Sequence, residues 1–110
     1  MQSLQKEITK TFFQTLEDIK TKQNFEIFFS DFLTSKELEI FSKRLAIAYW
    51  LSKGRDYENI KINLKVTSKA ITEVKNIINT SGIKLALKKM EAEEWANVWS
   101  ERVKKLANGH

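Results

Sequence analysis

The chain of 110 residues contains no proline and only three glycines, Gly54, Gly82 and Gly109. Proline and glycine most often end helices and form tight turns, so a chain with so few of them has few forced breaks. No segment alternates apolar and polar residues for long enough to indicate a half-buried strand. The sequence therefore predicts an all-α protein, and its length predicts a single domain over residues 1–110.

Apolar residues recur at helical spacing along almost the whole chain, as they do on amphipathic helices. The pattern predicts about six helices, at residues 3–22, 25–33, 35–53, 57–64, 68–79 and 83–106. Thr34 and Glu37 have the spacing of a capping box, which predicts the start of the third helix. Gly54 has the place of a C-terminal cap and predicts the end of that helix.

The third helix is apolar on nearly every face between Leu45 and Leu51. A helix that is apolar all round is buried all round. A single chain of this length has few other residues with which to surround such a segment. We therefore expect two copies of the chain to form an intertwined homodimer.

Charge is distributed unevenly along the chain. Residues 1–33 carry 4 basic and 5 acidic groups, a net charge of −1, whereas residues 34–79 carry 9 and 5, a net charge of +4. A basic middle segment beside a nearly neutral front indicates an anionic partner. The alternative from charge alone is a solvated basic surface without such a partner.

Residues 57–79 contain two short helical patterns separated by the three residues Lys65 to Thr67. The apolar positions have the spacing of a helix-turn-helix, in which they pack together and leave the second helix facing outwards. These inner positions are Ile60, Leu64, Val66, Ile71 and Val74. The alternative is an ordinary helical hairpin with a solvated polar face.

The outward side of the second helix carries short polar groups, an amide and lysines. Such groups can contact base edges in the major groove, and lysines can contact phosphates. Thr67 is expected to cap this helix. The predicted DNA-binding residues are Lys61, Lys65, Thr67, Ser68, Lys69, Thr72, Lys75 and Asn76.

Two lysines depart from the usual helix-turn-helix pattern. Lys65 occupies the turn position at which glycine is common, so we expect it to adopt a left-handed backbone conformation at some cost. Lys61 occupies a position at which a small residue is common, so its side chain is expected to extend outwards to the solvent. Both changes oppose tight sequence-specific binding, although they leave the hairpin intact.

Several motifs, taken in order, resemble the tryptophan-repressor superfamily. They are Phe32-Leu33-Thr34-Ser35-Lys36-Glu37-Leu38-Glu39, Lys43-Arg44-Leu45, Leu51-Ser52-Lys53-Gly54 and the helix-turn-helix at residues 57–79. Their order and spacing agree with the superfamily from about residue 28 to residue 87. Residues 88–110 are expected to form a helical extension beyond the usual end of its members.

The resemblance implies interlocked homodimers whose two reading heads face adjacent major grooves of a palindromic operator. It places Lys61, Ser68, Lys69 and Thr72 where family members contact double-stranded DNA. It therefore implies a DNA-binding transcriptional regulator, most simply a repressor. The alternative is a dimeric protein-interaction module that kept the fold and lost sequence-specific DNA binding. A reading helix with Glu73 and without arginine favours that alternative.

The resemblance also bears on a small effector. Members that bind tryptophan hold its indole between two arginines, and Arg44 stands at the first of these positions while Glu73 stands at the second. A carboxylate cannot donate a hydrogen bond to the carboxylate of the ligand and repels it. We therefore expect no cofactor and no binding of L-tryptophan, with Arg44 as the residue kept from such an effector site.

Other classes of protein find little support. There is no cysteine, the one histidine is the terminal His110, and no glycine-rich phosphate loop is present, so we expect no enzyme, no catalytic residue and no metal site. No stretch approaches the roughly 20 apolar residues of a membrane span, and the N-terminus lacks the apolar core of a signal peptide. We expect a cytoplasmic protein without a membrane partner.

The three tryptophans, Trp50, Trp95 and Trp99, could form a stacking platform for single-stranded nucleic acid. At helical spacing, aromatic residues are more often part of a core. We expect Trp50 in the core, and Trp95 and Trp99 either in the core or at an interface with a second copy or another protein.

Overall fold

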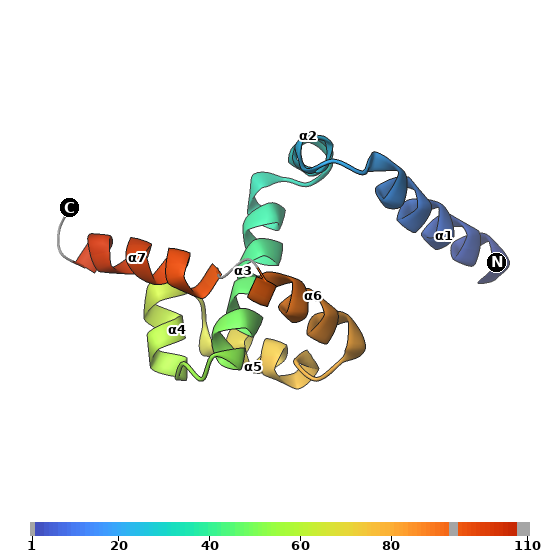
Figure 1. The fold of residues 1–110 in the computed structure, drawn as a ribbon. Coiled ribbons are helices and arrows are strands. Elements are labelled where there is room, and N and C mark those ends of the chain that lie inside the picture. Colours follow the sequence, from blue (N-terminus) through green and yellow to red (C-terminus); the bar gives the residue numbers. More distant parts are fainter. Residues whose placement is uncertain (1, 93–94, 108–110) are drawn as a thin grey trace. The chain divides into compact units, whose positions relative to one another are not determined.

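The computed structural model describes residues 2–92 and 95–107. Figure 1 shows the helices in chain order. They are α1 (Gln2–Ile19), α2 (Lys22–Phe32), α3 (Ser35–Ser52), α4 (Tyr57–Leu64), α5 (Ser68–Ile77), α6 (Ser81–Ala92) and α7 (Trp95–Ala107). The described residues contain no strand, so the prediction of an all-α protein is confirmed.

The chain divides into two compact units, the N-terminal unit (Met1–Glu39) and the C-terminal unit (Ile40–His110). The boundary falls within α3, so the first turn of this helix belongs to one unit and the rest to the other. The single domain expected from chain length stays a prediction.

The N-terminal unit consists of α1, α2 and the start of α3, and the rings of Phe12 on α1 and Phe32 on α2 are in contact. The ring centroids of Phe12 and Phe32 are 6.0 Å apart, and those of Phe28 and Phe32 are 4.9 Å apart. Yet none of the described residues of this unit is buried. Its most exposed large apolar side chains are Leu4, Ile8, Phe13, Ile27 and Phe32.

The ends of these helices follow from local hydrogen bonds and backbone geometry. Lys20 has a left-handed backbone, with φ 66°, so α1 ends three residues before the predicted residue 22. At the start of α3, the N–H of Thr34 donates to Glu37 Oε1 at 2.9 Å, and the N–H of Glu37 donates to Thr34 Oγ1 at 3.1 Å. The predicted capping box is confirmed. Gly54, with φ 83°, follows α3 as predicted.

The core of the C-terminal unit surrounds the end of α3. Four consecutive residues, Ile47 to Trp50, are each only 1% exposed. Successive side chains on a helix point about 100° apart, so these four cover every side of it. They pack with three further buried residues of α4 and α5, which are Ile60, Ile71 and Val74.

The burial of Ile47 to Trp50 within one chain differs from what the sequence predicts. The apolar segment Leu45 to Leu51 was expected to need a second chain to cover it, but one chain covers its centre by itself. Two pairs of helices cover the segment. Helices α4 and α5 contact it with buried residues, and α6 and α7 contact it through Ile83, Leu87, Met90, Trp99 and Val103. The homodimer stays a prediction, but Ile47 to Trp50 no longer argue for it.

The C-terminal part of the chain forms two helices, α6 and α7, where one helix over residues 83–106 was predicted. A single helix of that length would extend roughly 36 Å, because each residue adds about 1.5 Å. Two shorter helices allow both apolar stripes to pack against the same small core. The expectation of one helix was wrong because the stripe continues in phase along the sequence and does not reveal this requirement.

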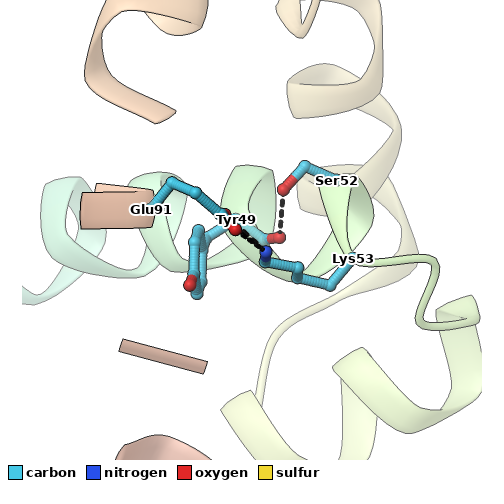
Figure 2. Close-up of polar contacts among 4 residues, drawn as sticks. All are labelled: Tyr49, Ser52, Lys53 and Glu91. Atoms are coloured by element: carbon cyan, nitrogen blue, oxygen red, sulfur yellow. Dashed lines mark hydrogen bonds and ion pairs between the residues drawn. The ribbon is translucent and has the colours of Figure 1, made fainter. Parts of the chain in front are cut away.

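The end of α6 is fastened to the end of α3 by a polar contact (Figure 2). Lys53 Nζ donates to Glu91 Oε1 at 2.6 Å and also contacts Oε2. The hydrogen bond from Lys53 to Glu91 raises the pKa of the lysine above its ordinary value. Close by, Ser52 Oγ donates to the carbonyl oxygen of Tyr49 at 2.6 Å.

In the part of the chain that the structure describes, no helix combines the length and the apolar character needed to cross a membrane.

Candidate DNA-reading surface

Helices α4 and α5 form the predicted hairpin, and the expected apolar positions hold it to the core. Ile60 and Ile71 are fully buried, and Val74 is nearly so. Leu64 and Val66 are partly buried and pack against the same cluster. All five inner positions of the predicted helix-turn-helix therefore lie on the inside.

Each helix of the pair begins at a side-chain cap. Asp56 Oδ1 accepts from the N–H of Asn59 at 2.8 Å at the start of α4, and Thr67 Oγ1 accepts from the N–H of Ala70 at 3.1 Å at the start of α5. Such caps satisfy amides that have no partner within the helix. The prediction that Thr67 caps the second helix is confirmed, and its oxygen is engaged by the backbone.

The turn between the two helices passes through Lys65 in the left-handed region, with φ 55° and ψ 56°. This is the strained conformation that was expected where glycine is common. The turn is stabilised by the N–H of Val66, which donates to the carbonyl of Lys61 at 3.2 Å, and by Lys43 Nζ, which lies 3.5 Å from the carbonyl oxygen of Lys65.

The role of Lys43 was missed in the sequence analysis. Lys43 lies on α3, 22 residues before the turn that it contacts. No periodicity or motif links two positions so far apart, and only the packing of α3 beside the hairpin brings them together.

The outward face of α5 is polar and exposed. Its residues repeat at intervals of three and four, which places them on one side of a helix. They are the predicted Ser68, Lys69, Thr72, Lys75 and Asn76, and all are exposed. Ile71 and Val74 point the other way, into the core.

Charged side chains of the hairpin are exposed near this face. Lys61 is exposed on α4, as expected from its outward extension. Lys75 Nζ lies 5.6 Å from the centre of the Tyr57 ring, a cation–π contact that joins α5 to the start of α4. Glu73 is exposed as well and adds one negative charge to the flank of the surface.

Arg44, the residue predicted for an effector site, is in contact with an aromatic ring of its own helix. Its guanidinium carbon lies 5.4 Å from the ring centre of Phe41 on the same helix. Both Arg44 and Glu73 are exposed. The predictions about an effector, and the assignment of individual DNA-binding residues, stay predictions.

Among the described residues, no group of three or more histidine, aspartate or glutamate side chains is placed to hold a metal ion. The surface of the hairpin is instead suited to an extended anion with hydrogen-bonding edges, because lysines and short polar side chains share it.

One comparison with known proteins identifies a family. The model of the family described as Trp repressor protein matches residues 7–91. The match extends further towards the N-terminus than the motifs at residues 28–87, and it includes most of α1 to α6 but not α7. No curated protein and no solved structure matches the chain.

Proposed function

The chain belongs to the Trp repressor family, and we propose that it is a dimeric transcriptional regulator, most simply a repressor, that reads a palindromic operator in duplex DNA through α5. The observation that carries this proposal is the polar face of α5. Five exposed side chains that can donate hydrogen bonds share one side of a capped helix, while the opposite side is buried. A helix of this kind fits the major groove.

The two kinds of side chain on this surface have different tasks. Lys61, Lys65 and Lys75 neutralise phosphates, and this contribution weakens as salt rises because counterions are released on binding. Ser68, Lys69, Thr72 and Asn76 contact base edges, and with them any preference for sequence arises. Thr67 contributes through the cap that orients the first turn of α5.

The dimer of this proposal is formed by the N-terminal units of two copies. Large apolar side chains on both helices of this unit are exposed while none of its described residues is buried, and an open groove of about 500 Å³ is lined by residues of α1 and α2. Its lining is mostly apolar and consists of Ile19, Asn24, Ile27, Phe28, Asp31 and Phe32. Two-fold symmetry would present two copies of α5 to a palindromic operator, whose half-sites we expect to be about 10 base pairs apart.

The first experiment is selection of bound duplexes from a random DNA library at two salt concentrations. We expect enrichment of a palindrome with half-sites about one helical turn apart. Lys69→Ala and Thr72→Ala should change which bases are selected. Lys65→Ala should leave the selected sequence intact and lower the salt slope by about one unit. Lys10→Ala on α1 is the matched control and should change neither.

Two other outcomes separate the alternatives. Binding without enrichment that vanishes at higher salt would show that the surface recognises phosphates only. A folded dimer that binds no duplex at low salt would overturn the proposal and favour the protein-interaction module. In that case a pulldown would use the full chain as bait. Thr72→Asp, on the exposed face of α5, would be the variant expected to prevent a protein partner from binding there.

A further inference from the structure

Helix α7 lies beyond the matched family range, yet it packs against the core beneath the DNA-reading surface. The ring of Trp99 meets Tyr49 at a centroid distance of 5.4 Å and an angle of 83°, and meets Trp50 at 6.2 Å and 62°. Val103, one turn further along α7, packs against the same cluster. These edge-on aromatic contacts are the favourable geometry for ring pairs.

Trp50 is also in contact with the segment that leads into α4. The guanidinium carbon of Arg55 lies 4.2 Å from the centre of a Trp50 ring. Arg55 Nη1 donates to Asn59 Oδ1 on α4 at 2.8 Å, and the N–H of Arg55 donates to the carbonyl of Trp50 at 3.1 Å. A continuous series of contacts therefore runs from Trp99 on α7 through Trp50 and Arg55 to Asn59.

Within this series, the orientation of the Trp50 ring depends on the side chains packed against it. The residue is only 1% exposed, and its Nε1 has no hydrogen-bond partner among the described residues. A buried ring without a hydrogen bond is oriented by the side chains that touch it. Trp99 and Arg55 are two of these side chains, and they belong to different elements.

A second contact ties the same region together. Lys53 reaches Glu91 at the end of α6, and its Nζ lies 5.4 Å from the centre of the Tyr49 ring (Figure 2). Glu91 is the last residue of the family match. The contact between Lys53 and Glu91 therefore holds the end of α6 near the end of α3, shortly before α7 in the sequence.

We infer that Trp99 is a positioning residue for DNA reading, which acts through Trp50 and Arg55 on the orientation of the α4–α5 pair. The inference rests on the proposed function, since it concerns the same reading surface. It gives α7, which the family match does not include, a role in DNA binding through the core of the C-terminal unit.

The test measures the affinity of the full chain for its selected duplex, or for a random 20-base-pair duplex if none is enriched. Trp99→Ala should weaken binding about tenfold, as expected if the loss of the ring contacts lowers the population of the binding orientation of α4 and α5 to about one tenth. Trp99→Phe should restore most of the affinity. Val98→Ala, at an exposed position of the same helix, is the control and should have no effect.

Two further readouts separate positioning from other roles. The salt slope of binding should stay unchanged in Trp99→Ala, since no phosphate contact is removed. Arg55→Lys keeps the charge but loses the planar group that stacks on Trp50, so it should reproduce the loss, and the double variant should lose less than the sum of both. Arg55→Lys also serves as the test if Trp99→Ala fails to fold.

The inference is overturned by a folded Trp99→Ala with unchanged affinity, by a reduced salt slope, or by strictly additive losses in the double variant. If the unsubstituted chain binds no DNA, the proposed function fails, and the positioning is then tested by nuclear magnetic resonance. Trp99→Ala should shift the side-chain amide signals of Asn59 while Val98→Ala does not. Unshifted signals would overturn the positioning as well.

Discussion

The two units of this protein start from the same kind of sequence pattern and bury it to different degrees. In the N-terminal unit, α1 and α2 carry regular apolar stripes, but none of their described residues is buried. In the C-terminal unit, seven of the residues that the structure describes are buried and form one core. The difference lies in the number of covering elements, because α1 and α2 contact mainly each other, whereas several helices surround the end of α3.

The comparison indicates where each unit obtains its stability. The core of the C-terminal unit is complete within one chain. Large apolar side chains are exposed in both units, but the N-terminal unit has no buried residue among those described, and an apolar helix face without a core to cover it indicates an interface. Dimerisation through the N-terminal unit, which we propose above, would remove this difference. The following predictions test it.

The largest effect is expected from Ile71→Ala in the core of the C-terminal unit. Ile71 is fully buried, so its truncation should lower the free energy of unfolding by about 2–5 kcal/mol, from the lost burial and the cavity left behind. Urea unfolding at two protein concentrations measures the change. The loss should be the same at both concentrations. A strong dependence on concentration would show that this core, too, relies on a second chain.

The next effect is expected from Ile8→Asp on the exposed stripe of α1. Ile8 is 53% exposed in the single chain, so the monomer should tolerate the change. A carboxylate in an apolar interface loses hydration, and we expect dimerisation to weaken by on the order of 2 kcal/mol. Sedimentation equilibrium measures this, with Lys10→Gln, an exposed position on the opposite side of α1, as the control with the same change in charge. Equal dimerisation of both variants would refute an interface at this stripe.

A moderate effect is expected from Thr34→Ala at the helix that both units share. The substitution removes one half of the capping box, so the free energy of unfolding should fall by about 1 kcal/mol. Ser35→Ala, next to the cap, is the control. Two separate unfolding transitions, only one of them shifted, would show that the units unfold independently. One shifted transition would show that α3 couples them.

A smaller effect of opposite sign is expected from Lys65→Gly in the turn of the hairpin. Glycine adopts the left-handed conformation at no steric cost, so the variant should be more stable by about 0.5 kcal/mol, after the higher entropy of its unfolded chain is subtracted. Thermal unfolding measures the gain. A loss of stability would show that the side chain of Lys65 contributes more than its backbone strain costs.

The smallest effect concerns pH and the contact of Lys53 with Glu91. The pKa of Lys53 is raised in the folded chain, because its hydrogen bond with Glu91 favours the charged form. Its contribution to stability is therefore fully present below the unfolded pKa and is lost as the pH rises through the higher folded value. Lys53→Met should remove this alkaline dependence, which unfolding experiments between neutral and strongly alkaline pH would detect. An identical pH profile in both proteins would contradict the assignment.

The hairpin and the two ends of α3 could be predicted in detail because their signals are local. Caps at Thr34 and Thr67, the helix end at Gly54 and the left-handed turn at Lys65 each depend on a few neighbouring residues. The inner and outer faces of α5 follow from helical periodicity alone. The sequence therefore predicts which residues form the polar face of α5, but not the contacts that surround the hairpin.

Contacts between distant segments were not predictable in this way. Lys43 at the turn, Lys53 with Glu91, and Trp99 against Trp50 join positions that no period or motif connects. The same limit explains the expected single helix at residues 83–106, since a continuous stripe contains no signal that two pieces of it must reach one small core.

The all-helical class, the starts of α3, α4 and α5, the α4–α5 hairpin and the family followed from the sequence, because these depend on local hydrogen bonding and on spacing along the chain. Which apolar stripes are covered depends instead on how the helices pack in three dimensions. The segment from Ile47 to Trp50 is enclosed by its own chain, while the stripes of α1 and α2 stay exposed. Burial depends on how many elements meet at one place, and a linear pattern does not contain that number.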